Sequence, residues 1–559
     1  LRIQIKFIFI IHKVYCSINI VMRKIETLIV GAGLIAALAA TGTVVWREMA
    51  PASDKLAHSY PTTKYGAFLA AQHAIYVNDF QRAADFSRNL DNIEYAVVYN
   101  TRMLSEFLSG NMPMDAKLMR DEKNAAARLI YDAYLVDAGK WDELYKRHKK
   151  DTSALSAPLR IWSSVATGHS ADAIKFIEKL PTNESWKAFT RGQIYAQTGD
   201  IKRAEKEFAA VSPDFMNIND YLYVMSFYRA NEMAGAAAKL RDEFTSRPGG
   251  MYMLGYGAVP DWSEFSGNKN ALAFSLIQSV SHTQIMMYSD LALLLLRFAQ
   301  IAGPAYQGQN DAVNYYLGQY FYNNVGDYAK HFSAIKKDSP FYLFGILRMS
   351  DKSGDISALA AAFDANPLFV PGANRLIAHY VSHGDRRAAL RVVSRALGDE
   401  NITPQGRGYF LKSRAQINFV FGDLDDAQAD LRAASDLLPP DGEILALQSK
   451  IWARQNRELD NAYEYAMGLV RQNPTDVAAW DVLGRVVAVR ESPDAALELI
   501  ERVGEVSNTC SALFEHLGDL YVQTGNKKLA SDAYMRAIDL ADDGLSVIPV
   551  LEKKIRNLK

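Results

Sequence analysis

The chain has almost no cysteine, with Cys16 and Cys510 the only two among its 559 residues. This scarcity excludes a disulfide framework and a cysteine-based metal site. The chain also lacks an excess of either charge, because 62 lysines and arginines are balanced by 63 acidic residues, for a net charge of −1. Proteins that bind the phosphates of nucleic acids normally carry a basic excess, so nucleic acid is not expected as a partner.

Motifs for catalysis and for small ligands are missing as well. The sequence contains no phosphate-binding loop, nucleophile elbow or cysteine–histidine arrangement, so we predict no catalytic residue, no cofactor, no small-molecule substrate and no enzyme. His379 and His383 have the helical spacing of metal ligands. No glutamate lies between them, however, and a helix is expected to end at Gly384, where histidine suits the carbonyl-rich terminus. We therefore predict no metal site.

One long stretch without charge runs from Leu28 to Trp46. Gly31 and Gly33 fit part of a dinucleotide-binding fingerprint, but no second apolar strand follows to close the βαβ unit that such a site needs. A helix of this length spans roughly 28 Å, close to the hydrocarbon thickness of a bilayer. We therefore expect residues 22–52 to form an uncleaved membrane anchor, with a signal segment as the alternative.

The residues before this stretch set its expected orientation. Arg23 and Lys24 precede the apolar run, so the rest of the chain is expected on the non-cytoplasmic side. Residues 1–21 are a doubtful leader with two interpretations: either translation starts at Met22, or the leader is a second hydrophobic segment. Residues 53–64 are expected to be a linker.

The C-terminal part of the chain repeats itself. Small residues recur at intervals of 35, 34 and 34 residues, at Ala427, Ala462, Ala496 and Ala530. The last unit reads Phe514-x-x-Leu517-Gly518-x-x-Tyr521, then Gly525, Ala530-x-x-x-Tyr534 and Ala537. This period and pattern resemble the tetratricopeptide repeat, a pair of antiparallel helices. Small residues where the helices meet let their backbones approach, and Gly525 allows the tight turn between them.

The resemblance predicts the fold. It implies an all-α, right-handed superhelical solenoid of antiparallel helix pairs behind one N-terminal transmembrane helix. The apolar run from Met286 to Ala302 is interrupted by Asp290 and Arg297, so we expect a buried repeat helix there rather than a second span. The expected regions are N-terminal repeats at 65–244, an irregular, divergent helical region at 245–300, degenerate repeats at 301–403, and C-terminal repeats with a capping helix at 404–559.

From Tyr65 onward the chain resembles the large membrane-anchored or exported tetratricopeptide-repeat proteins of α-proteobacteria. The stretches "FEHLGDLYVQTGNKKLASDAYMRAIDL", "SALAAAFDANPLFVPGANRLIAHY" and "AIKKDSPFYLFGILRMS" carry this resemblance. It implies a scaffold that binds protein partners and no particular chemistry. Together with the expected anchor and its orientation, the resemblance predicts a single-pass protein of the bacterial inner membrane, with its repeats on the periplasmic side.

Candidate partner-binding residues follow from the register of the helices. Tyr316, Tyr320 and Asn323 share one helical stripe, expected to line the concave groove of the array; the alternative is that the tyrosines pack between helices. The same register adds five more residues to the predicted groove: Lys412, Gln416, Arg485, Glu515 and Asp519. This mix of charges lacks the paired basic set of co-chaperones that grip C-terminal carboxylates.

These observations predict a membrane-anchored scaffold of the bacterial cell envelope that binds proteins or extended peptide segments. The alternative in the same class is an exported soluble or outer-membrane-associated adaptor. An enzyme accessory subunit with activity in residues 245–300 is the rival from another class. No paired carboxylates or metal-spaced ligands support that rival.

Overall fold

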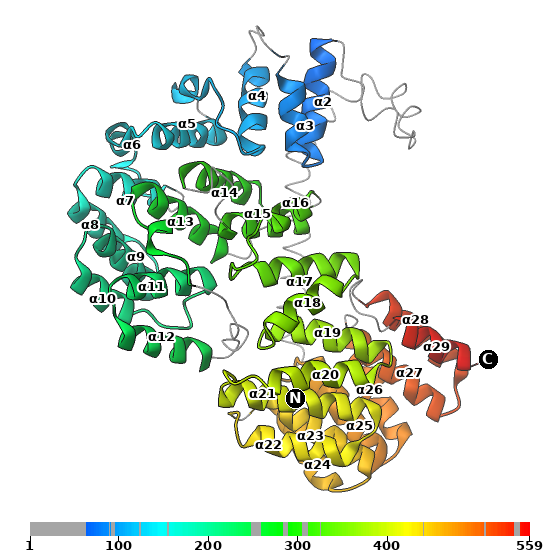
Figure 1. Ribbon diagram of the computed structural model, residues 1–559. Coiled ribbons are helices and arrows are strands. Elements are labelled where there is room, and N and C mark those ends of the chain that lie inside the picture. Colours follow the sequence, from blue (N-terminus) through cyan, green and yellow to red (C-terminus); the bar gives the residue numbers. More distant parts are fainter. Residues whose placement is uncertain are drawn as a thin grey trace.

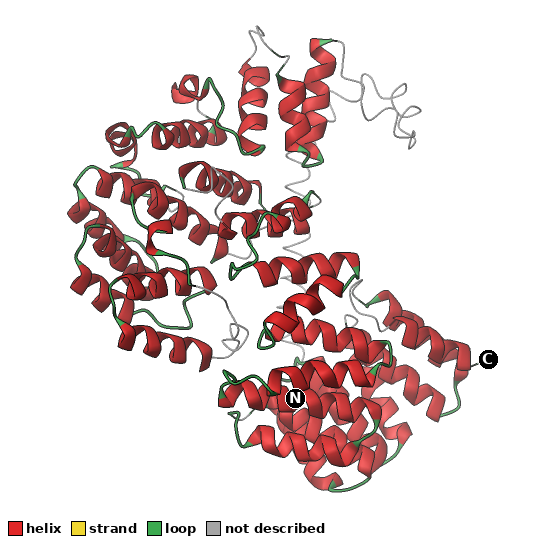
Figure 2. Cartoon of the chain, in the orientation of Figure 1, coloured by secondary structure: helices red, strands yellow, loops and turns green. Residues whose placement is uncertain are grey.

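The computed structural model describes residues 63–558 apart from residues 89, 91–95, 122–123, 154–155, 247–258, 283–288, 304–310, 325, 440, 508–509 and 542–547. Across these residues the chain forms 28 α-helices, α2–α29, and no β-strand, which confirms the all-α prediction (Figures 1 and 2). The predicted leader and anchor, and all but the end of the linker, lie outside the described residues. In the described part, every helix is too short or too polar to cross a bilayer.

The first eleven helices form a curved row that we call the first array (Figure 1). Each helix packs against the next along the chain, as in a solenoid, with α10 and α11 meeting through aromatic rings. Their bounds are α2 (Lys64–Tyr76), α3 (Phe80–Ser87), α4 (Ala96–Leu108), α5 (Ala125–Asp137), α6 (Trp141–His148), α7 (Ala157–Ala166), α8 (Ser170–Lys179), α9 (Glu184–Gln197), α10 (Ile201–Ala209), α11 (Ile218–Ala230) and α12 (Ala234–Ser246), with the 3-10 helix η3 (Ala116–Asp121) before α5.

The next helices turn back into the curve of the first array (Figure 1). Helix α13 packs against α7 and α9, and α14 packs against α4 and α5. Residues 245–300, predicted to be an irregular, divergent helical region, include α13 and most of α14. The bounds of this group are η5 (Trp262–Glu264), α13 (Asn268–Ser281), α14 (Asp290–Ala302), α15 (Asp311–Asn323) and α16 (Tyr328–Ser333).

Helix α14 contains most of the apolar run that resembles a second membrane span. It has 13 residues, and Leu293, Leu296 and Phe298 are at most 1% exposed within the protein core. Its N-terminus is capped by Ser289, whose hydroxyl accepts a hydrogen bond from the backbone of Ala292. The prediction of a buried helix is confirmed.

The second array runs from α17 to the C-terminus, and α17 joins it to the first by packing on α15 and α16. Its helices pair in order, with α29 packed on α28 at the end of the stack. The bounds are α17 (Tyr342–Ser353), α18 (Ser357–Ala365), α19 (Val370–Ser382), α20 (Arg386–Leu397), α21 (Pro404–Phe421), α22 (Leu424–Ser435), α23 (Gly442–Gln455), α24 (Leu459–Gln472), α25 (Val477–Arg490), α26 (Pro493–Val506), α27 (Ser511–Gln523), α28 (Lys527–Asp539) and α29 (Ile548–Asn557).

Small residues let the paired helices of the second array approach closely. A Cβ added to Gly484 in α25 would lie 2.5 Å from the Ile500 side chain of α26, and one added to Gly518 would collide with the Tyr534 ring. Gly525 has a φ of 84° in the turn between α27 and α28, a conformation that side chains disfavour. These glycines have the roles predicted for them from the repeat pattern.

Candidate partner-binding surfaces

The inner surface of the first array is occupied by the chain's own helices. The Trp162 indole of α7 donates a hydrogen bond to the Ser275 hydroxyl of α13 over 2.7 Å, and both side chains are buried. The Gln278 amide of α13 likewise donates to the Asp220 carboxylate of α11 over 2.8 Å. Because buried polar groups on both sides are satisfied by each other, this surface is a closed internal interface.

An aromatic cluster seals the same interface. The Phe274 ring of α13 stacks on Phe189 of α9 and lies 4.6 Å from the ring of Tyr223 of α11, measured between centroids. Trp262 and Phe265, from the segment before α13, also pack on Tyr223. Burial raises the pKa of Tyr223, which is fully enclosed. A partner segment has no access to this part of the array.

The structure corrects the prediction for two of the candidate residues. Tyr316 and Tyr320 of α15 are only 8% and 2% exposed, and burial raises the pKa of both hydroxyls. They pack between helices, because α13 and α14 cover the stripe on which they lie. This was the alternative interpretation of the tyrosines. Asn323, at the end of α15, is exposed.

The charged candidates lie on the first helices of the second array, on a face that we call the first-helix row. It consists of the side chains of α21, α23, α25 and α27 that follow the stripe through Gln416 and Arg485. Lys412 in this row is buried, and its ammonium donates to the carboxylates of Asp441 and Glu443 over 2.7 and 2.6 Å. The partner of Lys412 is therefore the next repeat.

A second charge group follows along the row. Arg485 pairs with Asp481 one turn earlier in α25, at 2.9 Å, and His516 Nδ1 of α27 lies 2.7 Å from the same carboxylate. Burial opposes ionisation of Asp481, but His516 and Arg485 outweigh it and hold the pKa of Asp481 below its ordinary value. Arg485 is half-buried, and its charge is already neutralised by Asp481.

The last two candidates are covered by the capping helix. The Lys554 ammonium of α29 lies 2.8 Å from Glu515 and 2.7 Å from Asp519. The Tyr534 hydroxyl also donates to Asp519 over 2.7 Å. Glu515 and Asp519 therefore fasten the cap to the last repeat.

Several of the residues that stay open on the first-helix row are apolar. Gln416 is exposed, and Val420, four residues later on α21, is 54% exposed. Val489 of α25, four residues after Arg485, and Val522 of α27 are 43% and 44% exposed. Val420 and Val489 each lie four residues after a predicted groove residue, Gln416 and Arg485 respectively, and therefore share its helical face. Helical spacing could have identified both valines from the sequence, but the prediction did not include them.

One cation beside this row, near Asp481 and Arg485, has no counter-ion in contact among the described residues. Lys450 of α23 is half-buried, and among the described residues none forms an ion pair with its ammonium within 4 Å. Burial lowers the pKa of Lys450, although the charge of Asp481 acts in the opposite direction. Lys450 therefore retains the capacity to bind an acceptor group brought by a partner.

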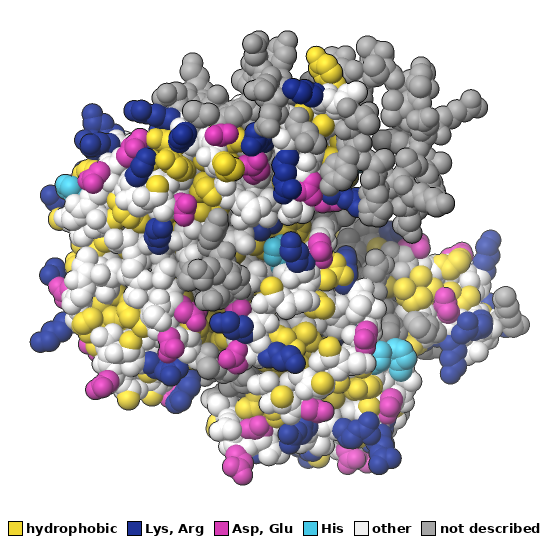
Figure 3. All heavy atoms as spheres, turned by 45° about the horizontal axis from the view of Figure 1, so that its top comes forward, with side chains coloured by type: hydrophobic (Ala, Val, Ile, Leu, Met, Phe, Trp, Pro, Cys, Tyr) yellow, Lys and Arg dark blue, Asp and Glu magenta, His cyan; other side chains and the backbone are white. Residues whose placement is uncertain are grey.

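Elsewhere the surface carries mixed charge. On the face drawn in Figure 3, basic and acidic side chains are interspersed with hydrophobic ones. For metals, the described residues contain no group of three or more histidine, cysteine or acidic side chains arranged to hold an ion. His379 and His383 stack on each other with ring centroids 4.2 Å apart.

Comparisons with known proteins identify the repeat. A family model described as "Tetratricopeptide repeat" matches residues 512–543. Mitochondrial import receptor subunit TOM70 of Mus musculus is 25% identical over 174 residues, which cover 29% of this chain and 28% of the receptor, and that of Rattus norvegicus matches equally. The chain thus matches less than a third of the length of these receptors.

Two solved structures match this chain at low sequence identity and low TM-score. YrrB, described as "a TPR protein with an unusual peptide-binding site", has 18% identity and a TM-score of 0.22, covering 35% of this chain and 100% of its own. Yeast Tom70 has 12% identity and a TM-score of 0.25, covering 89% of this chain and 95% of its own. Residues 512–543 thus match a tetratricopeptide repeat, and the described helices on either side of this unit pack in order, as in a solenoid.

Proposed function

We propose that this tetratricopeptide-repeat chain is a non-enzymatic scaffold that holds an extended segment of a partner protein on the first-helix row of its second array. The observation that carries the proposal is the set of exposed valines Val420, Val489 and Val522, which lie on three of the four first helices, α21, α25 and α27. In the described part of the first array no such set extends over several helices, because its inner surface is filled by α13–α15, and its exposed large hydrophobic side chains lie mainly on α2, at Tyr65, Leu69 and Tyr76. A weak match to an import receptor subunit supports a binding role over catalysis.

The chemistry of the row defines the partner segment. Most charges along it are paired within the protein, so they offer little net attraction to a charged ligand. The valines provide apolar contacts, Gln416 can hydrogen-bond a peptide backbone, and Lys450 can pair with a carboxylate. The proposed ligand is therefore an extended peptide with spaced apolar side chains and one acidic residue.

We further propose that residues 22–52 anchor the chain in a bacterial inner membrane with both arrays on the periplasmic side. The uncharged stretch 28–46 and the basic residues before it support this placement. In the alternative, the segment is cleaved and the arrays act as an exported soluble or outer-membrane-associated adaptor. Alkaline extraction of membranes separates the two, because only an uncleaved anchor keeps the chain in the pellet.

The test of partner binding uses photocrosslinking in the full-length chain. A photoreactive amino acid is placed at Val489 in the first-helix row or, as the control, at Met535, which is 48% exposed on the second helix α28. A defined adduct from position 489 and none from position 535 is expected. Lys450→Met should weaken that adduct, whereas Lys527→Met at the start of α28 should leave it unchanged.

Two results contradict the proposal. Adducts of equal yield from positions 489 and 535 would show that the row has no special role. An absence of adducts from 489 and from Val420, with the chain folded and in its membrane, would show that the row is not a binding surface.

A further inference from the structure

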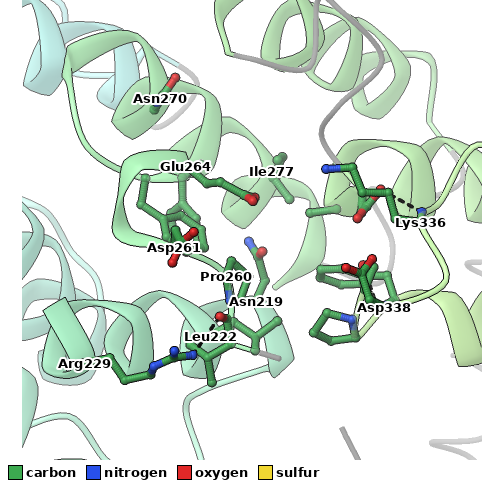
Figure 4. A pocket seen from close by; sticks show the side chains of 18 residues that line it. Asn219, Leu222, Arg229, Pro260, Asp261, Glu264, Asn270, Ile277, Lys336 and Asp338 are labelled. Carbon is green, nitrogen blue, oxygen red and sulfur yellow. Dashed lines mark hydrogen bonds between the residues drawn. The ribbon is translucent and has the colours of Figure 1, made fainter. Parts of the chain in front are cut away.

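A crevice of about 270 Å³ lies where the two arrays meet. Its walls come from α11, from the segment around η5, from α13 and α15, and from the turn between α16 and α17 (Figure 4). The floor is apolar except for one amide and is at most 4% exposed, formed by Asn219, Leu222, Phe274, Ile277 and Phe341. A crevice of this size is just below the roughly 300 Å³ of the smallest usual ligand pockets, so it fits one side chain or a small molecule.

The rim of the crevice is charged and predominantly acidic. Four carboxylates and two cations line it: Asp261, Glu264, Asp311, Asp338, Arg229 and Lys336. The Arg229 guanidinium already donates to the backbone oxygen of Val259 over 3.0 Å. Within the described part of the chain, neither the Glu264 carboxylate nor the Lys336 ammonium has an ion-pair partner within 4 Å.

The acidic groups influence one another. Burial raises the pKa of Glu264; the charge of Lys336 acts against this, and Asp311, Asp261 and Asp338 add to it. Burial also raises the pKa of Asp311, against the hydrogen bonds from Lys336 and Ser339. Carboxyl groups whose ionised form is disfavoured in this way are stabilised when a cation binds between them.

Asn219 supplies an independent sign of a missing ligand. Its side chain is 2% exposed at the floor of the crevice, yet its Nδ2 has no hydrogen-bond partner in the described structure. Figure 4 shows the Asn219 amide and the Glu264 and Lys336 side chains directed toward one space. An unpaired buried donor is unfavourable, so an acceptor brought into this space would be bound by Asn219.

We propose that this junction crevice binds an organic cation of the alkylguanidinium class that also carries a carbonyl group. The guanidinium donates in several directions, which suits carboxylates on opposite walls of the crevice. Its alkyl stem lies on Leu222, Ile277 and Phe341, and the carbonyl accepts from Asn219. A metal ion is a poorer fit, because the described residues contain no grouping that could ligate one. This site is separate from the first-helix row, so its failure leaves the proposed function unaffected.

Calorimetry on the full-length chain tests the site with three probes. N-acetyl-L-arginine amide has both groups, agmatine has the guanidinium without the carbonyl, and N-acetyl-L-citrulline amide is the neutral isostere. We expect saturable binding of the arginine derivative and binding at least about tenfold weaker for the citrulline one, because the charge-assisted hydrogen bonds are lost. Agmatine should bind with intermediate affinity, and lowering the pH should weaken binding because protons compete for the carboxylates.

Variants assign the contacts. Asn219→Ala should abolish the preference for the arginine derivative over agmatine, a readout that a general loss of packing would not produce. Glu264→Gln and Asp311→Asn should each weaken the arginine derivative several-fold, whereas Glu505→Gln on the remote α26 should not. Equal affinity for the arginine and citrulline derivatives, or no saturation at millimolar concentration, would overturn the proposal.

The same titration separates two sources of the cation. A pentapeptide with arginine between alanines presents the same side chain on a backbone. If it binds more tightly than the capped amino acid, the site takes an arginine side chain of a polypeptide. If it binds equally or more weakly, the site takes a free small molecule.

Discussion

The hydrogen bond between Trp162 and Ser275 offers a direct test of the filled first array. Ser275→Ala removes the acceptor and leaves the indole N–H of a fully buried tryptophan unpaired. An unsatisfied buried donor costs about 1–3 kcal/mol. Trp162→Phe removes the donor instead and leaves space beside α13, so it should cost a similar amount or more. In the double variant no orphaned donor remains, so the two losses should not add.

Native-state hydrogen exchange is the appropriate assay, because repeat arrays open in parts and a single melting temperature does not describe them. Amides of α7 and α13 should lose protection together in both single variants. The coupling between the two substitutions should be at least about 0.5 kcal/mol. Ser435→Ala in α22, whose hydroxyl bonds only within its own helix, should change exchange by less than about 0.5 kcal/mol. Additive effects of Trp162→Phe and Ser275→Ala would refute the internal interface.

Two further predictions concern packing and pH. Gly518→Ala should destabilise the last repeat, because its Cβ would meet the Tyr534 ring. Gly468→Ala in α24 has nothing within 4 Å of its new Cβ and should stabilise its repeat by about 0.5–1 kcal/mol. Native-state hydrogen exchange of the α27 and α24 amides shows whether the two effects have opposite signs, as the packing requires. Burial and the nearby Arg297 lower the pKa of His331 to about 3. Between pH 6.5 and 3 the unfolded chain therefore binds a proton that the folded chain does not. As the pH falls through this range, the free energy of unfolding decreases by about 1.4 kcal/mol per pH unit. Denaturant unfolding of His331→Phe should show a shallower acid dependence, and an unchanged slope would contradict this assignment.

The helix pairs of the second array could be predicted because their packing is local. Gly484 and Gly518 are small for the reason that the repeat pattern implies, since each faces a large side chain 16 residues later in its own unit. Such contacts recur in each repeat, so the residues that make them appear at regular intervals in the sequence. The burial of α14 within the protein could also be predicted from the sequence, because Asp290 and Arg297 interrupt its apolar run.

The filling of the first array could not be predicted, because its contacts are distant along the chain. Trp162 and Ser275 are 113 residues apart and follow no period. The stripe through Tyr316 and Tyr320 was identified as one helical face, but periodicity does not show whether another helix covers that face. Only the position of α13 and α14 decides this, and it buries both tyrosines.

The paired charges of the first-helix row are an intermediate case. Lys412 meets Asp441 29 residues later, and Lys554 meets Asp519 35 residues earlier, separations close to one repeat. Opposite charges offset by about one repeat were therefore a recoverable signal that these residues bind their neighbours.

This pairing has a consequence for how the second array recognises a partner. A carboxylate or ammonium that already has a buried counter-ion gains little from a second one, and displacing the first leaves an unpaired charge behind. Discrimination between ligands therefore rests on the exposed groups, the three valines and Gln416, together with Lys450. Of these only Lys450 is charged, so a partner segment is selected by where its single acidic residue lies relative to its apolar ones. A scaffold built in this way selects extended peptides by the spacing of their side chains, because the distance between neighbouring repeats is fixed.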